Sequence, residues 1–206
     1  MKGVGWDFLT VLERPRQLRF PSFHRLGIGA LLSFLLALSP MAFAAAPSAT
    51  IQTCFAPEAD CAALAVRAID RAEHEILVGA YGLTTGAGIV EALLRAHRRG
   101  VEVKLIADKT TPCGRNSGID PLANAGVPVW IDYVARIAHA KTMVIDGIVT
   151  LNGSYNWTRG ASANSEDLNL VASPVVAEAY AAHWRDRQAV SLRFDRRESW
   201  CRAGMH

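Results

Sequence analysis

Apolar runs typical of β-strands alternate with amphipathic helical segments from residue 50 onward, and this alternation constrains the fold most strongly. The expected strands cover residues 51–55, 75–81, 101–107, 127–131, 142–145, 149–151 and 168–171. Between them, apolar residues in 60–73, 84–99 and 174–189 recur at the spacing of helices that bury one face. Strands separated by such helices form a sheet that helices cover on both faces. Because 142–151 has the spacing of an antiparallel hairpin, we expect an α/β domain with a mixed sheet.

Residues with special capping or backbone preferences indicate where the helices begin and end. Asp60 is a plausible N-cap for the first helix, and Thr84 or Thr85 can cap the second, which ends at Gly100. Pro174 fits the first turn of the closing helix. The remaining segments predict a polar loop at 108–118, a short helix before Gly126, a turn at Gly147, a helical turn at 154–163 and an irregular tail at 191–206.

The N-terminal segment has the pattern of an export signal. A basic stretch ends at Arg25, an uncharged run covers residues 26–46, and Ala42-Phe43-Ala44 has signal-peptidase spacing. An uncleaved membrane anchor is the alternative, since about 20 apolar residues can span a bilayer. Pro40 and the Ala-x-Ala ending favour cleavage. We therefore expect a signal peptide at 1–44, a single catalytic domain at 45–206, and a periplasmic or secreted bacterial protein.

The charge of the chain is concentrated in that same segment. The formal net charge is +3, from 22 Lys and Arg against 19 Asp and Glu. Residues 1–44 contain five basic and two acidic side chains, which leaves 17 of each sign from residue 45 onward. Overall charge therefore does not indicate a nucleic-acid partner, and only local patches can. Two basic clusters, 95–99 and 185–197, can either follow a phosphate backbone or simply solvate helices.

Four cysteines follow the N-terminal segment: Cys54, Cys61, Cys113 and Cys201. An even number in an exported protein permits disulfides. Cys54 and Cys61 flank a turn that contains proline, so they can pair, and Cys113 can then pair with Cys201. The sequence alone allows three pairings. A zinc site is the competing interpretation, but the chain has no zinc-ligand spacing.

Residues 137–170 carry the chemistry. His139 and Lys141 are two apart on a predicted strand, so their side chains share one face, and Asp146 ends that strand. Ser154 and Asn156 follow the predicted hairpin partner. A fixed cation, a hydroxyl and an amide that converge beside an imidazole suit a phosphate diester, whose oxygens they can neutralise and bind. No carboxylate cluster for a metal appears, so Lys141 takes the cationic role and no cofactor is expected.

The spacing H-x-K-x₄-D-x₆-G-S-x-N resembles the signature of the phospholipase D superfamily, at His139, Lys141, Asp146, Gly153, Ser154 and Asn156. Residues 164–166 resemble the acidic segment that follows this signature, and residues 76–84 resemble the family strand that leads into Tyr-x-x-Thr. The resemblance covers residues 51–189. It is strongest to the small bacterial endonucleases that carry a single motif and are related to a plasmid-encoded nuclease.

The resemblance implies a mechanism and a quaternary structure. His139 would attack phosphorus and form a phosphohistidine, and a second imidazole would serve as acid and then base. Because the chain has one motif, the second imidazole would come from a second copy in a homodimer. The phosphate oxygens would be held by Lys141, Ser154 and Asn156. Glu166 would orient an imidazole by accepting a hydrogen bond from its other N–H group. Asp146 belongs to the catalytic motif but would act as a structural partner within it.

Three functions fit this signature. The first is an endonuclease without sequence preference, with DNA as the most favoured substrate. The second is a phospholipase D that hydrolyses phospholipid head groups, which would favour an exposed apolar surface beside the site, whereas loop 108–118 is polar. The third is an inert nucleic-acid-binding module, against which the intact His139, Lys141 and Asn156 argue.

Other candidate residues have plainer interpretations. His74, His97 and His183 lie in amphipathic patterns and are expected on solvated faces. The glycine-rich segment 82–88 is expected to cap a helix near the site, because it lacks the lysine of a phosphate-binding P-loop. Tyr81 either lines the pocket or belongs to the core.

Overall fold

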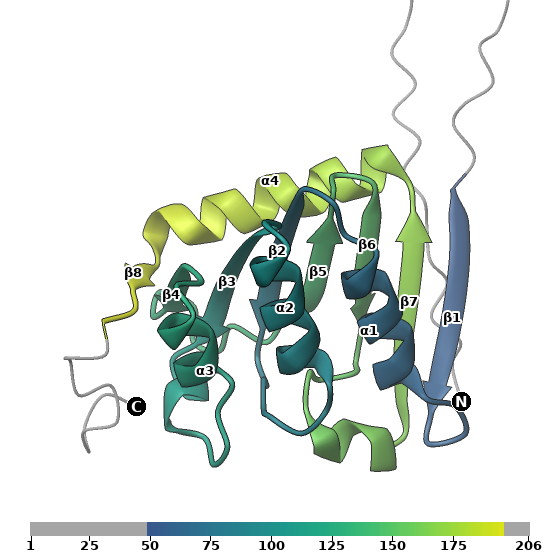
Figure 1. The fold of residues 1–206 in the computed structure, drawn as a ribbon, viewed down its shortest axis with the longest axis horizontal. Helices are drawn as coiled ribbons and strands as arrows, with labels where there is room; N and C mark the ends of the chain where they lie inside the picture. The colour runs from purple at the N-terminus through teal and green to yellow at the C-terminus, as the bar shows by residue number, and fades with distance from the viewer. Residues whose placement is uncertain (1–48, 196–206) are drawn as a thin grey trace, which may run out of the picture. The chain divides into compact units, whose positions relative to one another are not determined.

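Eight strands form one mixed sheet in the computed structural model, which describes residues 49–195 (Figure 1). The strands are β1 (Thr50–Ala56), β2 (Glu75–Ala80), β3 (Glu102–Asp108), β4 (Val129–Asp132), β5 (Lys141–Ile145), β6 (Val149–Gly153), β7 (Glu166–Ala172) and β8 (Leu192–Arg193). Their order is β1-β7-β6-β5-β2-β3-β4-β8, in which β2, β3 and β4 are parallel and the other neighbours antiparallel. The predicted mixed sheet is confirmed, and the two-residue strand β8 was not predicted.

Helices cover both faces of this sheet, as the sequence predicts (Figure 1). They are α1 (Cys61–Asp70), α2 (Ile89–Arg98), α3 (Ile119–Asn124) and α4 (Pro174–Val190), with 3₁₀ turns η1 (Thr111–Cys113) and η2 (Arg159–Ala163). The central strand β2 is buried on both sides: Ile76 and Val78 pack in the core with α1 and α2, whereas Leu77 packs against α4. This alternation follows from the two-residue period of a strand.

The starts of α1 and α4 contain the residues predicted there, whereas the start of α2 does not. Asp60 accepts a hydrogen bond from the Ala63 N–H at 2.9 Å, and Pro174 lies in the first turn of α4. Helix α2 begins only after Gly88, whose φ is +80°, so neither Thr84 nor Thr85 caps it. Instead, the backbone N–H of Thr84 donates a hydrogen bond to the Trp157 carbonyl, which holds this segment in place. Pairing between distant segments therefore overrides the local helix signal.

The β5–β6 hairpin contains the turn predicted at Gly147. Asp146 and Gly147 have φ values of +53° and +65°, and the Ile148 N–H donates to the Ile145 carbonyl at 3.0 Å. Positive φ at both central residues defines the turn that matches the twist of a two-stranded ribbon, and Asp-Gly is a preferred sequence for it. The turn lies at the opposite end of β5 from His139.

The structure describes three of the four cysteines but not the N-terminal segment. Cys54 and Cys61 form a disulfide, one of the pairings that the sequence left open, and it ties β1 to α1. Cys113 is also disulfide-bonded, whereas Cys201 lies outside the described residues. The expected signal peptide at 1–44 lies outside them too. In the part of the chain that the structure describes, no helix has the length and apolar character needed to cross a membrane.

Candidate active site

A pocket of about 350 Å³ lies at the edge of the sheet where β5 begins and β6 ends. Its lining residues are His139, Lys141, Gly153, Ser154, Asn156 and Glu166. Strand β5 runs antiparallel to both of its neighbours, β2 and β6, so the residues that precede β5 meet those that follow β6. The topology therefore brings together all the predicted site residues except Asp146.

His139 and Lys141 are in direct contact. His139 lies just before β5 rather than within it, but the backbone is still paired there, because the Tyr81 N–H donates to the Ala140 carbonyl at 2.9 Å. The Lys141 Nζ lies 2.8 Å from His139 Nδ1 and 3.1 Å from its Nε2, and donates to the His139 carbonyl at 2.8 Å. A cation thus lies against the imidazole, as a phosphate-binding site requires.

Lys141 is largely withdrawn from water, with 6% of its surface exposed. Burial lowers the pKa of its ammonium group, and the nearby Glu166 carboxylate opposes that shift. Burial acts in this direction because it penalises the charged form.

Tyr81 contacts both His139 and Lys141. The sequence had not decided whether this residue lines the pocket or belongs to the core. Its ring centroid lies 4.3 Å from that of the His139 imidazole, and the Lys141 Nζ lies 4.8 Å from the centroid of the same phenol ring. An aromatic face attracts a cation at this range. Tyr81 therefore forms one wall of the site.

Ser154 and Glu166 are joined within the pocket. The Ser154 hydroxyl donates to Glu166 Oε2 at 2.5 Å, and the Asn164 amide donates to Oε1 at 3.0 Å. Within the described chain, these are the side chains that donate to Glu166, so the predicted contact with an imidazole is not made inside one copy. A hydroxyl has a single proton to donate. Ser154 therefore has to release Glu166 before it can donate to a phosphate oxygen.

Asn156 contributes an amide with free capacity. Among the described residues, its Oδ1 is buried and lacks a hydrogen-bond partner. A Cβ on Gly82 would lie 3.1 Å from this oxygen, so the glycine keeps the space beside it open. A buried polar atom without a partner is costly, and a ligand that donates to Asn156 would remove that cost.

Asp146 and Gly153 have structural functions that the motif alone does not reveal. The Asp146 carboxylate accepts hydrogen bonds from the backbone N–H groups of Glu73, His74 and Glu75 at 2.8–2.9 Å. Asp146 thus ties the β5–β6 turn to the start of β2, away from the pocket. These contacts are those of a structural residue rather than a catalytic one. A Cβ on Gly153 would overlap the Asp167 carbonyl oxygen, so this glycine permits β6 to pack on β7.

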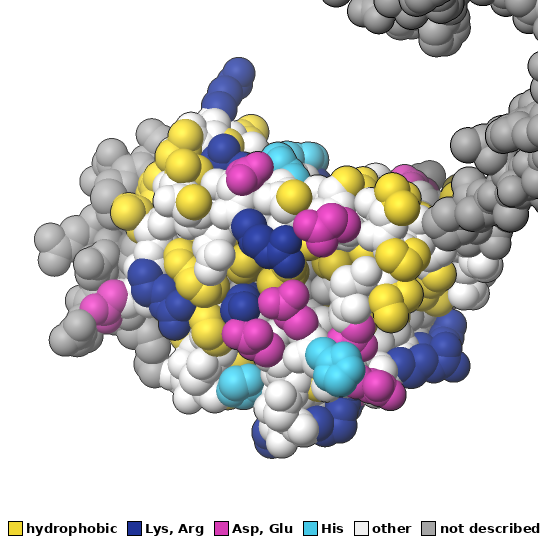
Figure 2. Space-filling view, turned by 90° about the horizontal axis from the view of Figure 1, so that it is seen from above, with side chains coloured by type: hydrophobic (Ala, Val, Ile, Leu, Met, Phe, Trp, Pro, Cys, Tyr) yellow, Lys and Arg dark blue, Asp and Glu magenta, His cyan; other side chains and the backbone are white. Residues whose placement is uncertain are grey.

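The two basic clusters noted in the sequence are largely occupied by internal contacts. Arg95 and Arg99 pair with Asp70, Arg187 pairs with Asp132, and Arg185 pairs with Glu178. Arg196 and Arg197 lie outside the described residues. Figure 2 views the molecule from above, from the edge at which β7 ends, and shows Lys and Arg side chains interspersed with Asp and Glu. Lys and Arg side chains therefore form no continuous basic surface on the face that Figure 2 shows.

Other basic residues lie in the connections that follow β3, β4 and β6, at the edge of the sheet where these strands end. Arg115 follows β3, Arg136 follows β4 and Arg159 follows β6. All three are exposed, and none forms an ion pair with another residue of 49–195. Sequence reasoning missed them, because each is isolated in the chain and only the topology gathers them at one edge.

A second pocket, of about 470 Å³, lies on the α4 side of the sheet and shares His139 with the first. Its walls include the apolar residues Ile106, Ile137, Ala138, Tyr180 and Trp184. Val134 and Ile137 in the adjoining loop are 65% and 49% exposed. The loop that leads into His139 therefore presents apolar side chains to solvent.

A family model described as the cardiolipin synthase, PLD-like domain, matches residues 65–187, which is more than half of the chain. The chain belongs to this phospholipase D-like family. It is therefore a phosphodiester hydrolase of the phospholipase D type.

Among residues 49–195, no group of three or more His, Cys, Asp or Glu side chains is arranged to hold a metal ion.

The chain is similar to relatives that are named for different activities within this family. The chain is 36% identical over 140 residues to a phospholipase D from Rickettsia felis, covering 68% of this chain and 70% of that protein. It is 40% identical over 93 residues to a mitochondrial cardiolipin hydrolase from Xenopus laevis, covering 45% and 44% of the two chains. The crystal structure of a phospholipase D family member, Nuc from Salmonella typhimurium, matches with a TM-score of 0.66 and 32% identity, covering 71% of this chain and 99% of that one.

Proposed function

We propose that this protein is a metal-independent endonuclease that cleaves nucleic acid, preferentially DNA, without sequence preference. The observation that carries this proposal is that Arg115, Arg136 and Arg159 are exposed at the same edge of the sheet as the pocket that contains His139 and Lys141. A nucleic acid presents a regular row of phosphates, and exposed guanidinium groups in three strand connections suit a backbone that extends beyond the cleaved bond. A small isolated diester would not need them.

The proposed reaction proceeds in two steps. A ring nitrogen of His139 forms a bond to phosphorus while the bond to the leaving oxygen breaks, and a second imidazole protonates that oxygen. The same second imidazole then removes a proton from water, which attacks the phosphohistidine and frees His139. Lys141 and the Nδ2 group of Asn156 donate to the phosphate oxygens throughout, and Ser154 joins them once it releases Glu166.

The second imidazole belongs, in this proposal, to the His139 of a second copy. A single chain carries one copy of the motif, and a two-fold axis beside the pocket would place two copies of His139 face to face. The Glu166 carboxylate would then orient one of these imidazoles across the interface, a contact that one copy does not make.

The proposed location is the periplasm or the extracellular medium. Cys54 and Cys61 are paired and Cys113 is also disulfide-bonded, and such bonds persist in oxidising compartments. The export pattern of residues 1–44 agrees with this location.

The central test is plasmid nicking by the mature protein in EDTA. We expect cleavage in EDTA, and we expect His139→Ala to abolish it while the fold is retained. His74→Ala is a matched control, since its backbone N–H contact with Asp146 survives the substitution. Cleavage that required added magnesium, or a fully active His139→Ala variant, would contradict the mechanism. DNA binding without turnover by the wild type would instead support an inert binding module.

A phospholipid hydrolase is the second candidate, and the apolar pocket beside His139 favours it. Val134 and Ile137 could enter a lipid surface while an acyl chain occupies that pocket. DNA, RNA and vesicles of phosphatidylcholine or cardiolipin, assayed side by side in EDTA, separate the two functions. Val134→Asp with Ile137→Asp should lower only vesicle hydrolysis if lipid is the substrate. Faster release of head groups than of DNA fragments would reverse the ranking.

A further inference from the structure

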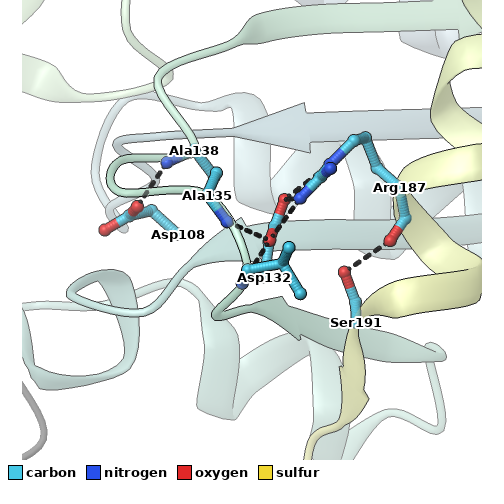
Figure 3. Close-up of polar contacts among 7 residues, drawn as sticks. Asp108, Asp132, Ala135, Ala138, Arg187 and Ser191 are labelled. Atoms are coloured by element: carbon cyan, nitrogen blue, oxygen red, sulfur yellow. Dashed lines mark hydrogen bonds and ion pairs between the residues drawn. The ribbon is translucent and has the colours of Figure 1, made fainter.

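Two buried carboxylates hold the loop that leads into His139 (Figure 3). Asp108 ends β3 and Asp132 ends β4, and the two residues are direct partners in the parallel register of these strands. Each is 1% exposed. Charged residues are almost never this deeply buried unless they are paired or fully hydrogen-bonded. Their placement side by side beneath residues 133–138 therefore indicates a function.

Asp132 holds the beginning of the loop. Its Oδ1 accepts hydrogen bonds from the backbone N–H groups of Val134 at 3.0 Å and Ala135 at 3.2 Å. Its other contacts are with Arg187 of α4, whose Nε and Nη2 donate to Oδ2 at 2.9 Å and 2.6 Å. The planar guanidinium fixes the carboxylate from two directions, so the backbone acceptor is itself held in place.

Asp108 holds the end of the loop. Its Oδ2 accepts a hydrogen bond from the Ala138 N–H at 2.7 Å, one residue before His139. Its Oδ1 accepts from the N–H and the hydroxyl of Thr110 at 2.9 Å and 2.6 Å. Both oxygens are thus occupied, and the carboxylate cannot turn without breaking bonds on its other side.

The loop has no regular secondary structure of its own, and Val134, Arg136 and His139 are exposed. Nothing in its sequence would select one conformation, because it lacks proline and glycine. In-line attack on phosphorus requires the imidazole to be held to within a fraction of an ångström. The two carboxylates supply that constraint from the rigid ends of β3 and β4.

We propose that Asp108, Asp132 and Arg187 are positioning residues that set the orientation of the His139 imidazole through the backbone of residues 133–138. They do not contact the reacting atoms in this proposal, although Asp132 and Arg187 also line the larger pocket beside His139. Arg187 extends the constraint to α4, so that helix, strand end and nucleophile form one rigid unit. The inference rests on His139 as the nucleophile of the proposed function.

The test uses bis(4-nitrophenyl) phosphate, a small diester that probes the chemistry whether the natural substrate is nucleic acid or lipid. Asp108→Asn, Asp132→Asn and Arg187→Lys should each lower kcat by roughly 10- to 100-fold, with KM within about twofold of the wild type. Arg187→Lys should show the smallest loss, because lysine keeps the charge but not the fork.

An ion pair of similar donor geometry, but at the surface, provides a control: the side chains of Arg95 and Asp70 are 43% and 38% exposed, against 30% and 2% for Arg187 and Asp132. Arg95 binds Asp70 through Nε and Nη2 between α1 and α2, in a geometry similar to that of Arg187 and Asp132. Asp70→Asn and Arg95→Lys should leave kcat and KM unchanged, although they also remove one bidentate pair. Breaking the buried pair costs more stability than breaking the exposed one, so melting temperatures of all variants are measured and kcat is compared at a temperature at which every variant is folded.

A second readout does not depend on turnover. The ¹H–¹³C NMR signal of the His139 ring, assigned by its absence in His139→Ala, should be single in the wild type and shifted or broadened in Asp108→Asn and Asp132→Asn. An unchanged signal together with unchanged kcat would overturn the proposal. An inactive wild type whose His139 signal still responds to these variants would reject the proposed hydrolysis while retaining the positioning function.

Discussion

At the scale of single residues, Lys141 determines how the site responds to pH. Its ammonium must be protonated to neutralise phosphate oxygens, and burial lowers its pKa from the ordinary 10.5. The cation is therefore lost as pH rises through a value below 10.5. We expect an alkaline limb of kcat/KM below that value, measured with bis(4-nitrophenyl) phosphate. A limb at or above the ordinary lysine value would show that Lys141 is not the titrating group.

Asp146 should affect stability rather than catalysis. Burial alone would raise the pKa of its carboxyl, but the N–H groups of Glu73, Glu75 and His74 outweigh burial and bring the pKa below 3.8. A lowered carboxyl pKa stabilises the fold above the unfolded value and loses that effect as pH falls through the folded one. Asp146→Asn should cost about 1–3 kcal/mol at pH 7 and leave kcat unchanged.

Urea unfolding at pH 7 and near pH 3 measures this difference. The cost of Asp146→Asn should shrink at the lower pH, because the carboxyl of the unfolded wild-type chain is protonated below about 3.9 and folding then has to release that proton. A large loss of kcat in a variant that remains folded at assay temperature would instead return Asp146 to the catalytic residues.

The site residues that the sequence predicted are those fixed by local spacing. His139 and Lys141 precede or begin one strand, and Ser154 and Asn156 follow its hairpin partner, so a short stretch of chain brings them together. Asp108 and Asp132 could not be found in this way. Their juxtaposition depends on the register between β3 and β4, which neither residue's sequence neighbours specify.

At the scale of elements, the loops after β3, β4 and β6 should set affinity for a polyanion. Replacing Arg115, Arg136 and Arg159 with glutamine should weaken DNA binding, and the slope of log affinity against log salt should fall by roughly 0.7–0.9 for each phosphate that is no longer neutralised. Turnover of the small diester should be unaffected. Fluorescence anisotropy across a range of salt concentrations measures the slope.

The matched control removes the same charge elsewhere. Arg67, Arg71 and Arg98 are exposed and lie on or directly after α1 and α2. Glutamine at these three positions should leave the slope unchanged. Equal effects from both triple variants would indicate a general electrostatic contribution rather than an interface at the pocket edge.

Elements with strong periodicity were predictable, and those defined by distant partners were not. The strand at Glu75–Ala80 follows its apolar run, and the helix at Cys61–Asp70 follows the helical spacing of its apolar residues. β8 is two residues long and exists because Leu192 and Arg193 pair with the edge of β4. The late start of α2 has the same origin, since Thr84 is engaged by a segment beside the site. Pairing partners far along the chain leave no local signal.

At the scale of the whole molecule, a shared site predicts how mixed populations behave. If each active site needs His139 from two copies, a dimer of wild type and His139→Ala is inactive. After subunits equilibrate, activity should fall with the square of the wild-type fraction, whereas independent protomers would give a linear decline. Mixing wild type with Asp70→Asn controls for exchange itself. Sedimentation should show a dimer, and a fully active monomer would exclude the shared site.

The two carboxylate anchors also divide the loop into parts that can and cannot change in evolution. Asp132 holds the backbone at Val134 and Ala135, and Asp108 holds it at Ala138. Arg136 and Ile137 lie between these fixed points. Mutations there can exchange charge for apolar surface without moving the nucleophile. A single scaffold can thus diverge toward nucleic acid or lipid by drift in a two-residue window, while its chemistry is inherited unchanged.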